Sequence, residues 1–171
     1  MILILNGSIA TGKTTLSWQL HEQLHQSVLL DGDYICTVNP SDIYDEQQTL
    51  YLFDTIRLLI EHHQGHGYVH FVVNYVFENA QQLQALLDRL APLSDDIHCF
   101  WLSCTEAEQA RRIHQRQTDQ VEWELKRALE LNGILGRASE TGFIGREIPT
   151  AEQEPADLAR QILRLAREGS G

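Results

Sequence analysis

The sequence predicts an α/β domain built on a parallel sheet, and three observations support this prediction. Short apolar segments alternate with longer amphipathic ones, a pattern that favours strands joined by right-handed helical crossovers. The strand-like segments are almost continuously apolar, as strands covered by helices on both faces are. The chain has no internal repeat and no linker-like stretch, so residues 1–171 are predicted to form a single domain.

The individual elements follow from hydrophobic periodicity and from helix end signals. Strands are expected at residues 2–5, 27–30, 68–74, 97–102 and, more weakly, 143–148. Helices are expected at residues 14–26, 45–63, 79–90, 105–117, 120–135 and 155–167. The first helix is indicated by Leu16, Leu20 and Leu24, which recur every fourth residue. Asn79 is expected to cap the third helix, and Pro92 to end it.

A glycine-rich turn separates the first strand from the first helix and reads G-x-x-x-x-G-K-T. In this position the backbone N–H groups of such a turn wrap a polyphosphate at the helix N-terminus. Gly7 and Gly12 permit the tight backbone, Lys13 brings positive charge to the β- and γ-phosphates, and the Thr14 hydroxyl is a ligand for Mg²⁺. The residues assigned to nucleotide binding here are Gly7, Ser8, Ile9, Ala10, Thr11, Gly12, Lys13, Thr14 and Thr15. The turn therefore predicts a nucleoside triphosphate site.

Two carboxylates, Asp31 and Asp33, follow the second strand. Ligands of parallel sheets bind beyond the carboxyl ends of the strands. Phosphoryl transfer needs Mg²⁺ near the phosphates and a group that orients or deprotonates the acceptor. Asp31 is assigned to the metal through water and Asp33 to the acceptor hydroxyl, although an ordinary Asx turn has the same sequence. Asn74, after the third strand, adds no charge to a metal shell, so more of that role falls on Asp31.

Arginines follow the fourth strand, and Arg112 and Arg116 are four residues apart on one helix face. Arginines above the phosphates neutralise the charge that develops on the transferring group. The alternative is a solvated helix whose arginines pair with acidic neighbours. We assign Arg112 and Arg116 to catalysis, together with Lys13 and Asp33.

The composition of the chain limits the classes of binding partner and the cellular location that we expect. The formal net charge is −11 and the pI is about 5.0, so extended contact with nucleic acid is not expected. No apolar run approaches the ~20 residues of a membrane span. Met1 leads directly into a strand, which leaves no room for a targeting peptide, and the three cysteines show no C-x-x-C spacing. A cytoplasmic protein of unspecified oligomeric state is expected. The histidines of residues 61–70 straddle a turn, which favours a titrating surface segment over a metal site.

These motifs together resemble the small P-loop kinases of the nucleoside-monophosphate-kinase-like group, which are small AAA-type ATP-binding proteins. Gluconate, shikimate and adenylylsulfate kinases and chloramphenicol phosphotransferases belong to this group. Residues 146–150 are similar to the adenine-side strand and loop of these proteins, which implies a nucleotide-binding role for Thr150. The resemblance implies a three-layer P-loop NTPase fold, with a five-stranded parallel sheet in the order 2-3-1-4-5. It also implies a mobile helical lid over about 105–120.

The chain also departs from this group. Asn74-Tyr75-Val76-Phe77 stands where shikimate kinases have three glycines, and Thr118-Asp119-Gln120 lacks the arginine of a Gly-Asp-Arg lid. The prediction is an ATP- and Mg²⁺-dependent kinase that acts on the hydroxyl of a small-molecule acceptor, which the sequence does not identify. ATP is favoured over GTP because no guanine-reading Asn-Lys-x-Asp motif is present. The alternatives are a regulatory ATPase or switch without a small acceptor, and a nucleoside or nucleotide kinase.

Overall fold

The protein forms a single parallel sheet of five strands. The computed structural model describes residues 1–40, 42, 45–116 and 118–169. The strands are β1 (Ile2–Gly7), β2 (Ser27–Asp31), β3 (His70–Asn74), β4 (Ile97–Ser103) and β5 (Arg146–Pro149). They pair in the order β2-β3-β1-β4-β5, and each pair is parallel. The predicted fold class and strand order are confirmed.

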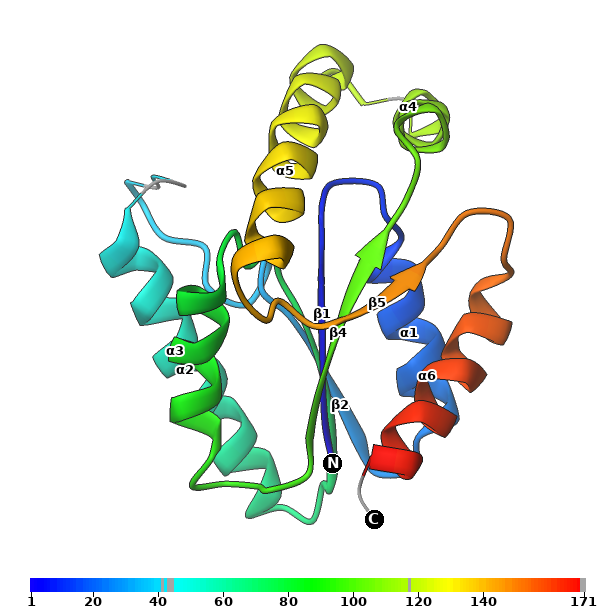
Figure 1. Cartoon of the computed structure of the whole chain (residues 1–171). Helices are drawn as coiled ribbons and strands as arrows, with labels where there is room; N and C mark the ends of the chain where they lie inside the picture. The colour runs from blue at the N-terminus through cyan, green and yellow to red at the C-terminus, as the bar shows by residue number, and fades with distance from the viewer. Residues whose placement is uncertain (41, 43–44, 117, 170–171) are drawn as a thin grey trace.

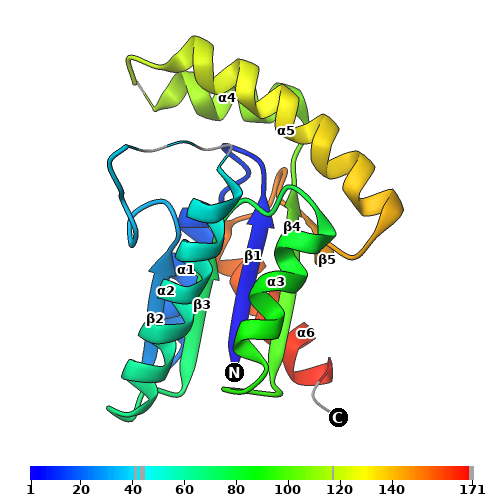
Figure 2. The same ribbon diagram turned by 90° about the vertical axis from the view of Figure 1, so that its left-hand side faces the viewer.

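Helices cover both faces of the sheet and its carboxyl end. They are α1 (Lys13–Gln23), α2 (Glu46–Gln64), α3 (Ala80–Leu90), α4 (Glu106–Gln115), α5 (Val121–Thr141) and α6 (Pro155–Gly169). Figure 1 shows α2 and α3 on one face of the sheet and α1 and α6 on the other. In Figures 1 and 2, α4 and α5 lie beyond the carboxyl ends of β1 and β4. This is the edge of the sheet where a ligand is expected.

The continuously apolar sequence of β1 is explained by its central position in the sheet. All its residues are buried, and alternate side chains face opposite layers. Ile2 and Ile4 belong to the core cluster that contains residues of α2 and α3. Leu3 and Leu5 belong to the cluster that contains residues of α1 and α6. The strand is therefore packed on both faces, and its carboxyl end is held at a fixed position.

Several element ends differ from the predicted ones. Helix α1 ends at Gln23 rather than 26, because Gln26 adopts a φ of 53° and the Ser27 hydroxyl donates to the His21 carbonyl at 2.9 Å. Strand β3 begins at His70 rather than 68, and the two residues before it are exposed. Strand β5 begins at Arg146, directly after Gly145 with a φ of 119°.

The ends of the two helices above the sheet also differ. Helix α5 continues to Thr141, beyond the predicted 135, because Leu135 and Ala138 pack against Ile144 in a separate apolar cluster. Helix α4 ends at Gln115, and the predicted end at residue 117 lies outside the described residues. Asn79 caps α3 as predicted, since its Oδ1 accepts a hydrogen bond from the Gln82 amide at 2.8 Å. No helix in the described ranges is both long enough and apolar enough to cross a bilayer.

Candidate functional site

The glycine-rich turn after β1 has a backbone that only glycine tolerates at two positions. Gly7 has a φ of 152°, and a Cβ there would lie 2.8 Å from both the Leu102 carbonyl oxygen and Thr11 Oγ1. Gly12, at the start of α1, has a φ of 98°. Asn6 Oδ1 accepts a hydrogen bond from the Gly7 amide at 2.7 Å, which fixes the start of the turn. The two glycines and this hydrogen bond therefore set the conformation of the turn.

Lys13 lies inside this turn. Its ammonium donates to the carbonyl oxygens of Gly7 at 2.9 Å and Ser8 at 3.1 Å, and the residue is only 9% exposed. Burial lowers the pKa of Lys13 from 10.5 to about 8, and the nearby carboxylates of Asp33 and Asp31 partly oppose this shift. The ammonium remains the main form at neutral pH, so the turn presents a positive charge.

Three oxygen-bearing side chains meet where β2, β3 and α1 approach one another. The Thr14 hydroxyl donates to Asp31 Oδ2 at 3.3 Å. Asn74 is fully buried and lies opposite Asp31 in the β2–β3 register. Its Nδ2 donates to Ser17 Oγ at 3.0 Å, whereas its Oδ1 has no hydrogen-bond partner among the described residues. Hydroxyl, carboxylate and amide oxygens are the ligand types that Mg²⁺ takes, so this donor set fits the predicted metal.

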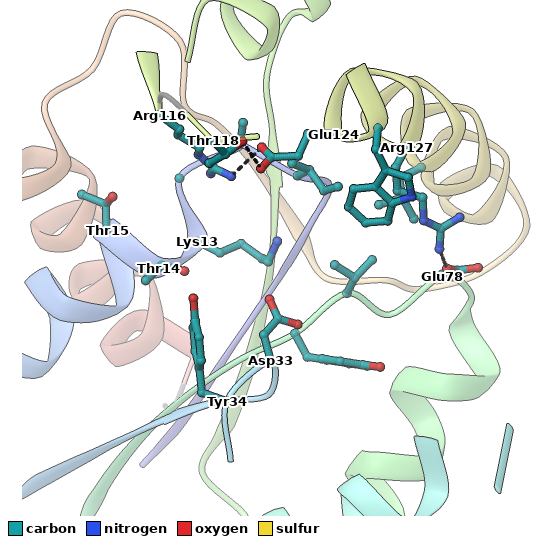
Figure 3. A pocket seen from close by; sticks show the side chains of 17 residues that line it. Lys13, Thr14, Thr15, Asp33, Tyr34, Glu78, Arg116, Thr118, Glu124 and Arg127 are labelled. Carbon is teal, nitrogen blue, oxygen red and sulfur yellow. Dashed lines mark hydrogen bonds and ion pairs between the residues drawn. The ribbon is translucent and has the colours of Figure 1, made fainter. Parts of the chain in front are cut away.

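Asp33 faces Lys13 across a cavity of about 730 Å³. Figure 3 shows the Lys13 ammonium and the Asp33 carboxylate pointing into the same space. Asp33 is accessible from the cavity, but the protein atoms around it limit its hydration and raise its pKa, against the opposing effect of Lys13. The structure thus places three of the four residues that the sequence assigns to catalysis, Lys13, Asp33 and Arg116, at one cavity.

The rest of the cavity lining comes mostly from residues that sequence reasoning missed. They are Tyr34, Tyr75, Glu78, Trp123, Glu124 and Arg127. Three of them belong to α5, which the sequence describes only as a polar helix and which begins after the predicted lid range of 105–120. No local motif marks these residues. The only signal is the position of α5 in the fold, after the fourth strand.

The two assigned arginines do not face the same cavity. Arg116 lines the cavity that holds Lys13 and Asp33, and its Nη1 lies 3.2 Å from Glu124 Oε2. Arg112 lines a second cavity of about 400 Å³, on the other side of the turn, which Thr15 and Thr150 also line. The assigned catalytic residues are therefore divided between two cavities.

Arg112 links three segments around the second cavity. Its Nη1 donates to the Ala10 carbonyl at 3.3 Å and its Nη2 to the Thr150 carbonyl at 2.9 Å. The Thr150 hydroxyl donates in turn to the Thr11 carbonyl at 2.9 Å. Glu108 Oε1 accepts from Arg112 Nε at 2.8 Å, and hydrogen bonds from Arg111 and Arg112 lower the pKa of Glu108 to about 2. Arg112 thus ties α4 to the glycine-rich turn and to the loop after β5.

Histidines within residues 61–70, from the end of α2 to the start of β3, contact one another. His62 and His66 stack with ring centroids 4.5 Å apart, and His66 Nδ1 lies 2.9 Å from the His62 carbonyl oxygen. Within the described residues, no group of three or more His, Cys, Asp or Glu side chains is placed to hold a metal ion.

The strand order and the glycine-rich turn between β1 and α1 define a P-loop fold of the kind found in small P-loop kinases. A protein-family model described as an AAA domain matches residues 2–131, and the chain belongs to this family. A search of curated proteins gave no match.

Solved structures share the fold at low sequence identity. The Deinococcus radiodurans tunicamycin resistance protein is 19% identical, over 96% of this chain and 94% of that one, with a TM-score of 0.66. A sugar kinase from Janibacter is 14% identical, over 95% and 92% of the two chains, with a TM-score of 0.69. A gluconokinase from Sinorhizobium meliloti is 16% identical, over 97% and 93%, with a TM-score of 0.63. At these identities the similarity establishes the fold.

Proposed function

We propose that the protein is an ATP- and Mg²⁺-dependent kinase that transfers the γ-phosphoryl group to the hydroxyl of a small molecule. One observation carries this proposal: Lys13 of the glycine-rich turn and Asp33 face each other across one cavity. A phosphate-binding cation and a carboxylate base on opposite sides of one space are what phosphoryl transfer to an alcohol requires. The names of the sugar kinase and the gluconokinase with the same fold support this reaction class.

The donor side of the reaction rests on the turn and on the oxygen ligands beside it. The backbone N–H groups of residues 7–14 and the Lys13 ammonium bind the β- and γ-phosphates. Thr14 and Asp31 would hold Mg²⁺, and Asn74, whose Oδ1 has no hydrogen-bond partner among the described residues, lies opposite Asp31 in the sheet. When bound, Mg²⁺ neutralises charge on the β- and γ-phosphate oxygens.

The acceptor side rests on Asp33. The hydroxyl oxygen of the acceptor forms a bond to the γ-phosphorus, the bond to the β–γ bridging oxygen breaks, and the hydroxyl proton passes to Asp33. Its raised pKa makes this carboxylate a better proton acceptor than an exposed aspartate. Arg116 lies at the edge of the same cavity and is the arginine that stabilises the developing charge.

Arg112 has a different role in this proposal. It lies at the second cavity with Thr15 and Thr150, where the resemblance to small P-loop kinases places the adenine ring. From there Arg112 positions the glycine-rich turn through the Ala10 carbonyl. A cytoplasmic location and a lid over about 105–120 remain parts of the proposal.

The main alternative is a nucleotide-dependent switch or regulatory ATPase without an acceptor. It is less well supported, because a carboxylate with a raised pKa facing the phosphate-binding lysine has no purpose in a protein that only binds nucleotide. Phosphorylation of a nucleoside or nucleotide is a narrower form of the proposed activity.

The test is transfer of labelled phosphate from ATP in the presence of Mg²⁺ and pooled metabolites. The proposal expects label on an organic acceptor, and expects the transfer to be lost in Asp33→Ala. Release of label only as inorganic phosphate, at the same rate with and without the pool, would show an ATPase and overturn the proposal.

A further inference from the structure

The acceptor side is the part of the 730 Å³ cavity away from the glycine-rich turn. Among the described residues that line this side, every cation is in an ion pair. Three basic and three acidic residues line the whole cavity. The basic ones are Lys13, Arg116 and Arg127, and the acidic ones are Asp33, Glu78 and Glu124. The proposed function assigns Lys13 and Arg116 to the phosphates of the nucleotide, and Arg116 also pairs with Glu124 at 3.2 Å. Among the described lining residues, only Arg127 is left to receive an anionic acceptor.

Arg127 already forms ion pairs with two carboxylates. It forms an ion pair with Glu78, and its Nη1 lies 2.8 Å from Glu130 Oε2. The Arg127 side chain is 9% exposed, so the guanidinium is buried between its partners. Figure 3 shows the Arg127–Glu78 pair at the side of the cavity away from Thr14 and Thr15. The three side chains together carry a net negative charge, and binding an anion there would require one of these pairs to break.

The same cavity presents aromatic rings on two sides. Tyr34, next to Asp33, is 78% exposed, and Trp123 of α5 is 52% exposed. Tyr75 also lines the cavity and makes edge-to-face contacts with Phe53 and Phe77, with ring centroids 6.2 and 5.6 Å apart. Aromatic rings that line a cavity and remain exposed bind flat or apolar faces of a ligand.

From this lining we propose that the acceptor is an uncharged hydroxylated molecule that carries a flat ring, the chemical class to which nucleosides and aryl glycosides belong. The ring packs against Trp123 and Tyr34, and the hydroxyl reaches Asp33. Molecules that bear a phosphate or carboxylate are excluded, because they meet Asp33, Glu124 and the paired Arg127 in a cavity that also holds a triphosphate. This inference rests on the proposed kinase function and deepens it, by naming the acceptor class.

Binding tests the inference independently of turnover. The probes are two matched pairs, uridine with uridine monophosphate and phenyl glucoside with phenyl glucuronide, measured by calorimetry with a non-hydrolysable ATP analogue and Mg²⁺. We expect the neutral member of a pair to bind at least about tenfold more tightly than the charged one. Equal or tighter binding of the charged members, or no binding of either neutral member, would overturn the inference.

Two variants sharpen the test. Trp123→Leu is expected to weaken the neutral probe by about tenfold, while Trp18→Leu, a change at a 53% exposed tryptophan on α1, leaves it unchanged. The double variant Glu78→Gln, Glu130→Gln releases Arg127 and is expected to raise the affinity for the charged members. If Trp123→Leu leaves the affinity for the neutral probe unchanged, Trp123 does not bind the ring of the acceptor.

Transfer of labelled phosphate to the same probes separates the two proposals. If neutral probes bind but receive no label, the acceptor class stands and the kinase function fails. If the charged probes are phosphorylated in preference to the neutral ones, the kinase function stands and the acceptor class is wrong.

Discussion

The proposed kinase site has a donor wall and an acceptor wall, which enclose the same cavity but are built in different ways. The donor wall is one continuous segment, residues 7–15, whose shape is set by backbone conformation and by hydrogen bonds to backbone atoms. The acceptor wall is assembled from residues after β2, residues after β3 and the first half of α5. Its shape depends on side chains such as Trp123 and Arg127 and on ion pairs between them.

This difference determines what each wall recognises. Polyphosphate is bound by N–H groups, whose positions depend little on the neighbouring side chains. An acceptor is bound by the side chains themselves, so a few substitutions change its identity. The following predictions separate the two walls, from the largest expected effect to the smallest.

The largest effect is expected from Lys13→Ala. Removing the only buried cation of the donor wall should abolish detectable phosphoryl transfer, because the β- and γ-phosphate charge is no longer neutralised. The measurement is transfer of labelled phosphate, with Lys126→Ala, at an exposed lysine on α5, as the control. Substantial transfer by Lys13→Ala would show that the donor wall works without its lysine.

Asp33→Ala should lower kcat by about a thousandfold and leave nucleotide affinity nearly unchanged, since the base belongs to the acceptor side. In the wild type, kcat should fall with decreasing pH through a pKa that lies above 3.8, because protonated Asp33 accepts no proton. Steady-state kinetics across pH and calorimetric titration with ATP check both points. The control is Asp88→Ala at an exposed position of α3, and full activity of Asp33→Ala would refute the assignment.

The two arginines should separate kinetically. Arg116→Ala is expected to lower kcat, and Arg112→Ala to raise the KM for ATP, each by roughly tenfold, the value of one lost charge-assisted hydrogen bond. The reason is that Arg116 lines the cavity of Asp33 and Arg112 lines the second cavity. Steady-state kinetics measure both, with Arg164→Ala on α6 as the control. The same effect from both variants would show that the cavities do not act separately.

The smallest effect is on the stability of the free protein. Between about pH 8 and 10.5 the unfolded chain holds the Lys13 proton and the folded protein releases it, so Lys13 makes stability rise with pH in this window. Below about pH 8 both states are protonated, and the full cost of burying the charge remains. The difference between the two pKa values corresponds to roughly 3 kcal/mol.

Lys13→Met removes this dependence. Denaturant unfolding of the wild type and the variant should therefore show the wild type gaining stability relative to Lys13→Met as the pH rises from 7 to 10. The comparison between the two proteins cancels the contributions of groups that they share, such as Cys99, whose pKa burial raises to about 12. A constant difference across this range would mean that Lys13 is not desolvated.

Sequence reasoning reached the fold and the donor wall because both are coded locally. The apolar run of β1, the two glycines and Lys13 are neighbours in the chain, and each constrains the backbone by itself. It also selected Asp31 and Asp33 as candidates, since they lie at the carboxyl end of a strand, where the structure places them near Thr14 and Lys13. It did not find Trp123, Arg127 or Glu78, because their shared surroundings arise only when α5 packs above the sheet.

Arg112 and Arg116 also show that the sequence does not predict features that depend on tertiary structure. Helical periodicity placed Arg112 and Arg116 on one face, with the correct spacing. However, Arg116 is the C-cap residue that directly follows α4, and its side chain reaches Glu124 of α5. Arg112 lies one turn earlier and is drawn to Thr150 and Ala10 instead. The residue at which a helix ends depends on tertiary contacts, and the hydrophobic periodicity of the sequence does not reveal it.

Helix α5 supplies the chemically distinctive half of the acceptor wall and contributes nothing to the strands of the sheet. The two walls can therefore change separately in evolution. Substitutions within this one helix would redirect the proposed kinase to another acceptor, while the glycine-rich turn that binds the phosphates keeps its shape.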